Sequence, residues 1–507
     1  MKISKYIFPA ILGCTALALL SQAFNRPASA AAVPANSNFE EIDTYLEEQI
    51  RRYNIPGAAL AVINNGMIVH QRGFGQARPA GEVPTPQTPF MIGSLSKSFT
   101  ALAVMQLVED GKIELDDPVQ KYLPWFRVAD PQVSSLITVR HLLNQTSGLP
   151  AWVGEIQLAD FDSITDAVEH QVRILSTVKP ERPAGSAFEY NNANYNLLGQ
   201  IVEVASGETY ADYIFTHIFK PLGMGHSYTS KAVAQQDNMA VGHQYWFTMP
   251  VAVPDMPQSV LSLPTGQLIS STEDMSQYLI TLLNGGRCGD KQILSESGVA
   301  GLFTGVAEST QMGLSFGYYG MGWFVDEIND TTLLWHSGTT PDFGSFMALL
   351  PEQKKGFILM FNANQHWMTP VFSDMGGGVA ALLAGIEPTP TQFVGTIPWI
   401  LRGQLLIPLL QIFGFLATVR VLQHWNLDPE SRPGKARLWG RHILLPLIPN
   451  LLIASSLIPV LGKTHNYLMV YMADLSWTVL ICGTFAGIWS IVRTGLMLKI
   501  NRQIAAD

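Results

Sequence analysis

The sequence is poor in cysteine and in charged residues. Its 507 residues include only three cysteines, and 14% of them are charged. Cys14 lies in an apolar leader and Cys482 in an apolar C-terminal segment, which leaves Cys288 alone in the rest of the chain. A single cysteine provides neither a disulfide framework nor a thiolate metal site. Because the histidines and acids show no spacing such as H-E-x-x-H, we expect no metal and no cofactor.

Basic stretches are scarce as well, and this scarcity excludes one class of partner. Residues 31–397 carry 18 basic and 36 acidic side chains, a net charge of −18. An acidic surface repels phosphate groups, so we expect no nucleic acid partner. The chain contains no internal repeat and no low-complexity tract. Its length allows one large core with additional segments.

The N-terminus has the composition of a secretory leader. Lys2 and Lys5 precede an apolar run, and a small-x-small cleavage site ends at Ala30. Residues 1–30 are therefore predicted to be a signal peptide and residues 31–38 a linker.

Three apolar runs near the C-terminus are each about long enough to cross a bilayer core of ~30 Å. They predict a three-helix transmembrane domain over residues 398–495, followed by a cytoplasmic tail over residues 496–507. Basic residues gather in the first connection and after the third run, so the positive-inside rule predicts a cytoplasmic location for both. The segment before the runs then lies outside the cytoplasm, in agreement with the leader. Asp474, in the third run, is expected to reach headgroups or water.

The middle of the chain predicts one α/β mixed (α+β) domain over residues 39–390. Asn64-Asn65-Gly66 predicts a hairpin turn, because Asn and Gly tolerate a positive φ. Residues 97–110 predict a helix that ends at Gly111. Strand patterns return over residues 321–361, after a long segment of helical pieces. We expect the strands from the two ends to pair into one sheet.

Ser94 and Lys97 lie one helical turn apart at the start of the apolar helix. This spacing places a hydroxyl and an amine on one face. Burial destabilises an ammonium ion, so a neutral Lys97 can take the hydroxyl proton and make Ser94 a nucleophile. An S-x-x-K tetrad arises readily by chance, and its meaning depends on partners elsewhere in the chain.

Tyr190 and Asn192 are the first such partners, at the point where a loop leads into a helix. A phenol beside a cationic lysine would have a lowered pKa and act as a base or proton relay. The Asn192 amide can bind a substrate carbonyl. Taken alone, the same residues are more typical of a helix cap with a buried tyrosine.

His336, Gly338 and Thr339 follow a strand predicted to end at Trp335. A glycine at this place lets a substrate backbone approach closely. The N–H groups of Thr339 and Ser94 are the expected donors of an oxyanion hole. Taken alone, His336 is typical of an ordinary histidine at a strand end.

Together the three motifs resemble the serine β-lactamase-related family, which includes class C β-lactamases, penicillin-binding-protein-like carboxypeptidases, D-aminopeptidases and esterases. Their order and separation match, and residues 141–149 (HLLNQTSGL) are also similar to the family. The resemblance covers about residues 39–385. It implies an antiparallel sheet flanked by helices, with a helical lobe and the site between them. It also implies that Ser94 is acylated, that Lys97 and Tyr190 move protons, and that water hydrolyses the acyl-enzyme.

One position departs from the β-lactamase branch, where the third motif usually begins with lysine and not with His336. A neutral imidazole attracts a substrate carboxylate less than an ammonium does, which disfavours β-lactam hydrolysis and carboxypeptidase action. The peptidase and esterase branches often have His-x-Gly. The leader, this domain and three spans together look like the membrane-bound peptidases that activate natural-product prodrugs by removing an acyl-D-amino-acid cap.

These observations predict an extracytoplasmic, membrane-anchored serine hydrolase that acts on peptides or N-acyl-D-amino-acid amides. Its expected partners are a small-molecule or peptide substrate and membrane lipid. The alternatives are an esterase, a cell-wall D-amino-acid-modifying enzyme, an acylated ligand sensor that signals through the spans, and a scaffold with a vestigial site. The sequence leaves the acyl group, stereochemistry, leaving group and oligomeric state open. Trp152, Tyr245-Trp246 and Phe343 are the candidate specificity residues in cleft loops.

Overall fold

The computed structural model describes residues 39–79, 81–159, 171, 173–311, 314–389, 391 and 393–504. The predicted signal peptide and linker lie outside the described residues. The described chain falls into two compact units. The larger one contains the residues up to Tyr245 and Met249–Val394, and the smaller one contains Trp246–Thr248 and the chain from Gly395 onward.

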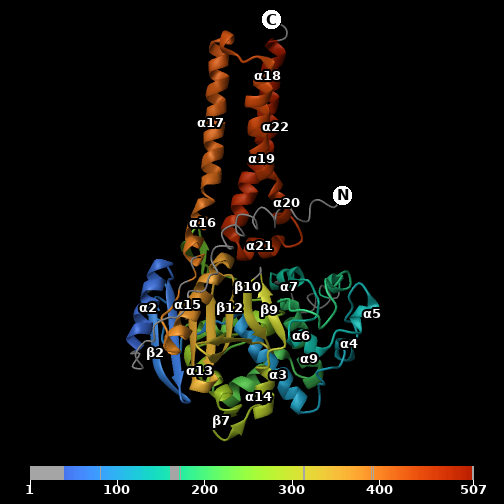
Figure 1. The fold of residues 1–507 in the computed structure, drawn as a ribbon, viewed down its shortest axis with the longest axis vertical. Coiled ribbons are helices and arrows are strands. Elements are labelled where there is room, and N and C mark those ends of the chain that lie inside the picture. The colour runs from blue at the N-terminus through green and yellow to red at the C-terminus, as the bar shows by residue number, and fades with distance from the viewer. Residues whose placement is uncertain are drawn as a thin grey trace. The chain divides into compact units, whose positions relative to one another are not determined.

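An eight-stranded antiparallel sheet is the frame of the larger unit, with the strand order β2-β1-β14-β13-β12-β11-β10-β9 (Figure 1). The pairing of β1 with β14 places Ala58 opposite Phe361, so strands from the two ends of the unit share one sheet, as predicted. The strand bounds are β1 Gly57–Asn64, β2 Met67–Gly75, β9 Ala307–Gln311, β10 Leu314–Tyr319, β11 Phe324–Ile328, β12 Thr331–Thr339, β13 Gly344–Leu350 and β14 Lys355–Phe361.

The turn between β1 and β2 is the predicted hairpin. Asn65 and Gly66 both have positive φ values, of 50° and 75°, as the favoured two-residue hairpin turn requires. Asn64 pairs with Met67 across the turn, so the register starts directly at the two turn residues.

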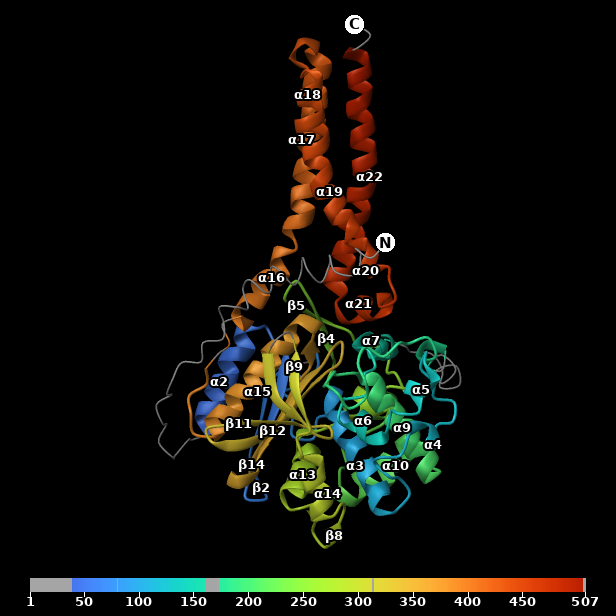
Figure 2. The same cartoon turned by 45° about the vertical axis from the view of Figure 1, so that its right-hand side comes forward.

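Helices cover both faces of the sheet. On one face α15 (Thr369–Leu383) packs on β13 and on α2 (Phe39–Arg52), and Figure 2 shows α2 and α15 side by side. Gly376 in α15 and Gly344 in β13 make this contact close, because a Cβ at either position would collide with a phenylalanine ring. On the other face α13 (Thr272–Leu283) packs on β1 and β14.

The helix that carries the first motif is α3 (Ser96–Glu109), and it is buried on nearly every side. It is preceded by a short 3-10 turn, η1 (Gly93–Leu95), and Gly111 follows it with a φ of 71°. The predicted helix over residues 97–110 is therefore confirmed. Because α3 lies in the main hydrophobic core, its first turn is a rigid support for a site.

A helical lobe fills the chain between β2 and β9. Its longest described helix is α9 (Asn192–Ser206), which Asn191 caps by accepting a hydrogen bond from the Ala193 N–H. The other helices are α4 Val119–Tyr122, α5 Pro131–Ser134, α6 Val139–Leu143, α7 Ala151–Leu158, α10 Tyr210–Ile214, α11 Lys220–Leu222, α12 Lys231–Gln236 and α14 Glu296–Leu302. Within the described residues, the same segment contains six short strands: β3 Phe90–Met91, β4 His243–Trp246, β5 Met249–Ala252, β6 Ile269–Ser270, β7 Arg287–Cys288 and β8 Lys291–Gln292. A seventh, β15 Ala363–Asn364, follows β14 and pairs in parallel with β4.

Three helical segments are long and apolar enough to cross a membrane, namely Val394–Leu427, Lys435–Val460 and Ala473–Ile500, and apart from Val394 they belong to the smaller unit. Their helices are α16 Ile397–Gly403, α17 Leu406–Leu427, α18 Lys435–Arg437, α19 Leu445–Ser455, α20 Leu457–Val460, α21 His465–Tyr471 and α22 Ala473–Ile504. Asp474 corrects one expectation, because it is fully buried and accepts a hydrogen bond from Gln404 Nε2 at 3.0 Å instead of reaching headgroups or water.

Candidate active site

Ser94 lies in the middle of η1, directly before α3. Gly93 shapes this turn with a φ of 53°, and a Cβ at Gly93 would lie only 2.3 Å from the backbone nitrogen of Thr339. The Ser96 hydroxyl donates to the Gly93 carbonyl at 2.7 Å and holds the turn in place. The absence of a side chain at Gly93 thus lets the end of β12 lie against the turn that presents Ser94.

Lys97 is fully buried, and its Nζ lies 3.0 Å from Ser94 Oγ. The same nitrogen lies 2.8 Å from Asn192 Oδ1 and 2.7 Å from the carbonyl oxygen of Thr265. Burial lowers the pKa of Lys97 well below its ordinary value. A neutral amine has two N–H donors and one lone pair. The two carbonyl oxygens can accept the two N–H bonds, which leaves the lone pair for the Ser94 hydroxyl proton.

Tyr190 completes the group around the nucleophile, but its ionisation differs from the prediction. Its side chain interacts with Ser94, and its ring centroid lies 4.9 Å from Lys97 Nζ. Burial raises the pKa of Tyr190, whereas the sequence predicted a lowered one. The physical reason is that a buried, neutral lysine offers no cation to stabilise a phenolate. Tyr190 is thus a protonated phenol that can donate or relay a proton.

Asn192 is held by the same arrangement. Its Oδ1 accepts hydrogen bonds from Lys97 Nζ and, at 3.1 Å, from Thr265 Oγ1. This leaves the amide Nδ2 as the part of Asn192 suited to a substrate carbonyl. The role of Asn192 in substrate binding stays a prediction.

Two supporting residues escaped the sequence analysis. Thr265 lies in the turn η3 (Leu263–Gln267) and contributes a backbone carbonyl, which has no sequence signature. Gln145 accepts from the backbone N–H of Asn191 at 3.0 Å and from Asn194 Nδ2 at 2.6 Å. It thereby ties the segment 141–149 to the second motif, and only that segment's resemblance to the family pointed to it.

His336 lies inside β12, which continues to Thr339 and does not end at Trp335 as predicted. Only 1% of its surface is exposed, and its Nδ1 lies 2.6 Å from the Ser337 carbonyl. Nδ1 therefore carries the proton, and Nε2 accepts from Tyr319 Oη at 3.4 Å. Burial and the nearby Lys97 lower the pKa of His336 to about 3, so the imidazole is neutral at physiological pH.

The end of β12 meets η1 through two glycines. A Cβ at Gly338 would lie 2.1 Å from the Ile92 carbonyl, just as one at Gly93 would meet Thr339. These close approaches bring the backbone of Thr339 next to the turn of Ser94. The geometry suits the two predicted oxyanion donors, whose role in stabilising an oxyanion stays a prediction.

The candidate specificity residues differ in their exposure to solvent. Tyr245 and Phe343 are buried core side chains: Tyr245 Oη donates to the Tyr53 carbonyl at 3.2 Å, and the ring of Phe343 packs edge-on against that of Phe90. Their predicted place in cleft loops is wrong. Trp152, on α7, is partly exposed. Within the described residues, no group of three His, Cys, Asp or Glu side chains could hold a metal ion.

The arrangement of these residues agrees with a comparison of the sequence with known protein families. The family model described as Beta-lactamase matches residues 42–369. The chain belongs to the β-lactamase family. The match covers the sheet, α3 and the helical lobe, and it ends before the apolar helices. The fold implied by the resemblance is confirmed.

Several known proteins are similar to this one. Protein flp of Staphylococcus aureus (strain MW2) is 30% identical over 339 residues, which cover 66% of this chain and 65% of flp. The chain thus spans just under two thirds of the length of flp. Penicillin-binding protein 4 of Amycolatopsis lactamdurans is 30% identical over 343 residues, or 66% of this chain and 87% of that protein. The octameric penicillin-binding protein homologue from Pyrococcus abyssi has a TM-score of 0.62 at 28% identity, with 70% of this chain and 80% of that chain covered.

Proposed function

We propose that this β-lactamase-family protein is a serine hydrolase that forms an acyl-enzyme on Ser94. The observation that carries the proposal is the environment of Lys97 Nζ, which lies 3.0 Å from Ser94 Oγ while two carbonyl oxygens occupy its other hydrogen-bonding directions. A buried amine in this geometry is a general base aimed at one hydroxyl.

In the proposed acylation, Lys97 removes the proton of Ser94 as Oγ attacks the substrate carbonyl. The N–H groups of Ser94 and Thr339 stabilise the oxyanion. Tyr190, which lies beside Ser94 and Lys97, donates a proton to the leaving nitrogen or oxygen and recovers one from protonated Lys97. The net result is that the serine proton moves to the leaving group. Deacylation repeats the steps with water as the nucleophile and releases a carboxylic acid.

The proposed substrates are peptides or N-acyl-D-amino-acid amides. The neutral, buried His336 supports this choice, because it supplies no cation for a substrate carboxylate next to Ser94. An esterase with the same residues is the second candidate. The two differ in the basicity of the leaving group, since an amide nitrogen needs the proton from Tyr190 more than an ester oxygen does.

The proposed location is the outer side of a membrane, with the three apolar helices as the anchor. The helices are long and apolar enough to span it. The basic first connection and C-terminus support a cytoplasmic location for those segments and an extracytoplasmic catalytic unit.

Intact-mass labelling tests the proposal. A fluorophosphonate and a β-lactam are incubated with the full chain, with the Ser94→Ala variant, and with Ser135→Ala, an exposed serine away from the site, as the control. We expect an adduct on the wild type and on Ser135→Ala only, and hydrolysis of N-acyl-D-amino-acid amides that Ser94→Ala abolishes. Hydrolysis that survives in Ser94→Ala overturns the assignment. A permanent acyl adduct of a natural ligand without turnover would favour the sensor.

A further inference from the structure

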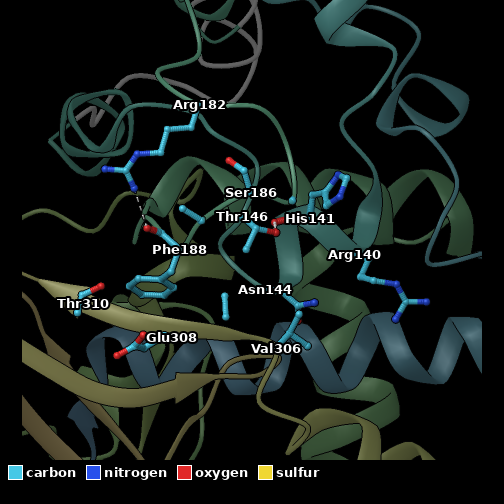
Figure 3. A pocket seen from close by; sticks show the side chains of 13 residues that line it. Arg140, His141, Asn144, Thr146, Arg182, Ser186, Phe188, Val306, Glu308 and Thr310 are labelled. Atoms are coloured by element: carbon cyan, nitrogen blue, oxygen red, sulfur yellow. Dashed lines mark hydrogen bonds between the residues drawn. The ribbon is translucent and has the colours of Figure 1, made fainter.

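A cavity of about 590 Å³ lies beside the catalytic residues, and none of them lines it. It is formed by the loops around Thr146 and Ser186 of the helical lobe and by β9, which contributes Glu308 and Thr310 (Figure 3). Its volume is in the range of about 300–1,000 Å³ that small-molecule sites occupy. The cavity is therefore large enough for a ligand of one or two amino-acid residues.

Aromatic contacts connect the cavity to the catalytic tyrosine. Phe188 lines the cavity, and its ring centroid lies 5.3 Å from that of Tyr319. The Tyr319 ring in turn packs edge-on against Tyr190, at 6.3 Å. Phe188 also precedes Tyr190 by only two residues. A ligand in the cavity is thus connected to the catalytic tyrosine through two packed rings, Phe188 and Tyr319.

Arg182 lines the cavity and makes a single side-chain hydrogen bond among the residues that the structure describes. Its Nη1 donates to the Phe188 carbonyl at 3.3 Å, as Figure 3 shows, and it forms no ion pair within the part of the chain that the structure describes. Arg140 also lines the cavity, but its guanidinium is engaged by both carboxylate oxygens of Asp116. A guanidinium with free N–H donors fits a carboxylate.

Asn144 provides an acceptor that lacks a donor. It lines the cavity, is 1% exposed, and its Oδ1 has no hydrogen-bond partner among the described residues. This oxygen is itself closed to solvent, so Asn144 belongs to the wall of the cavity and is not a ligand contact.

His141 adds a second neutral group to the same wall. Its Nδ1 accepts from the Thr138 backbone N–H at 3.2 Å, so Nε2 carries the proton. Nε2 lies beside Gly185, where a Cβ would come within 3.0 Å. Burial lowers the pKa of His141, which keeps the imidazole neutral. Glu308, on β9, is the acid of the cavity and disfavours a second carboxylate on a ligand.

We propose that this cavity binds an N-acylated amino-acid carboxylate, with the ligand carboxylate on Arg182. Two sources have this chemistry: the C-terminal residue of a peptide substrate, and a free N-acyl amino acid such as a released product. In both cases the cavity is an accessory site that adjoins the catalytic residues.

A binding experiment tests the site without turnover. The full chain carrying Ser94→Ala, in detergent, is titrated calorimetrically with N-acetyl-D-alanine and N-acetyl-L-alanine, and with the corresponding amides, which lack the carboxylate. We expect at least one acid to bind more tightly than its amide. Arg182→Gln should weaken the binding of the acid by about tenfold or more, the effect of losing a charge-assisted hydrogen bond.

The matched control is Arg127→Gln, because Arg127 is also exposed on the helical lobe and donates only to backbone carbonyls in the described chain. Equal affinities for the acid in the Arg182 and Arg127 variants overturn the proposal, as does the absence of measurable binding of both acids to the Ser94→Ala chain.

A kinetic experiment with Ser94 intact distinguishes the two sources, and this part rests on the proposed hydrolase function. If the ligand is the C-terminal residue of the substrate itself, Arg182→Gln lowers kcat/KM for peptides with a free C-terminal carboxylate. The kcat/KM for the corresponding C-terminal amides then stays unchanged. If the ligand is a separate acid, Arg182→Gln abolishes only the effect of added N-acetyl-alanine on the rate. Failure of the hydrolase proposal leaves the calorimetric result intact, so the two failures can be told apart.

Discussion

At the residue scale, the chemistry depends on which groups around Ser94 are charged. Lys97 and Tyr190 were both expected from the sequence, and both lie next to Ser94. Their protonation states follow from burial, which shifts both groups toward their neutral forms. The resting site thus holds an amine and a phenol, and the amine is the proposed base.

This assignment predicts the behaviour of a Lys97→Met variant. We expect acylation by a fluorophosphonate to slow by roughly 10²–10⁴-fold, because proton removal from Ser94 is lost. In the wild type, the rate should stay high at pH values well below the ordinary lysine pKa, since burial lowers the pKa of Lys97. The acylation rate measured across pH checks both points. Lys112→Met, at an exposed position of the same domain, is the control and should leave the rate unchanged.

His336 gives a prediction about stability. Burial lowers its pKa from 6.5 to about 3, so between these values the unfolded chain binds a proton that the folded chain does not. The contribution of His336 to stability is therefore present above pH 6.5 and is lost as the pH falls toward 3. Between pH 6.5 and pH 5 the loss is about 1.6 kcal/mol.

Urea unfolding of the full chain at these two pH values measures this loss. In a His336→Gln variant the stability difference between pH 6.5 and pH 5 should shrink by this amount relative to the wild type. An identical pH dependence in the two proteins would show that His336 titrates normally in the folded chain.

At the element scale, prediction succeeded where the signal was local. The β1–β2 turn and α3 follow from residues within a few positions of one another. The last residues of β12 were missed because Ser337 and Gly338 are poor strand formers. Their conformation is set by pairing with β13, where Gly338 lies opposite Ser345. The Thr265 carbonyl was missed for a related reason, since any residue type carries a backbone carbonyl.

The contact between η1 and β12 yields a prediction for Gly93→Ala. The new methyl group would lie 2.3 Å from the Thr339 nitrogen, at a φ of 53° that an alanine rarely adopts. We expect β12 to move away from η1, a loss of roughly 10²-fold or more in acylation rate as one oxyanion donor is displaced, and a loss of about 1–3 kcal/mol in stability.

The control for this variant is Gly377→Ala. Gly377 lies in α15, and a Cβ there would meet no atom within 4 Å. That substitution should leave acylation unchanged and raise stability by up to about 1 kcal/mol, because alanine favours a helix. Wild-type acylation kinetics in Gly93→Ala would refute the proposed role of the contact.

At the scale of the whole molecule, the sequence contains two independent indications of where the catalytic unit lies. The leader predicts export, and the distribution of basic residues around the three apolar helices predicts a cytoplasmic first connection. Both follow from composition over long segments. The same long-range reasoning correctly predicted that strands from the two ends of the domain share one sheet. Neither the topology prediction nor the strand-pairing prediction depends on detailed side-chain packing. The pKa of Tyr190 does, because it is raised by burial.

The native cysteines allow this topology to be tested. Cys288 is partly exposed in the catalytic unit, and Cys482 is buried in the third apolar helix. A membrane-impermeant maleimide should therefore label Cys288 on intact cells stripped of any outer envelope, and Cys288→Ser should remove the signal. A Glu430→Cys substitution in the Cys288→Ser background places a thiol at an exposed position of the first connection. It should react only after permeabilisation, because that connection is predicted to face the cytoplasm. Labelling of this double variant before permeabilisation, together with no labelling of Cys288 in the wild type, would invert the topology and place the proposed hydrolase inside the cell.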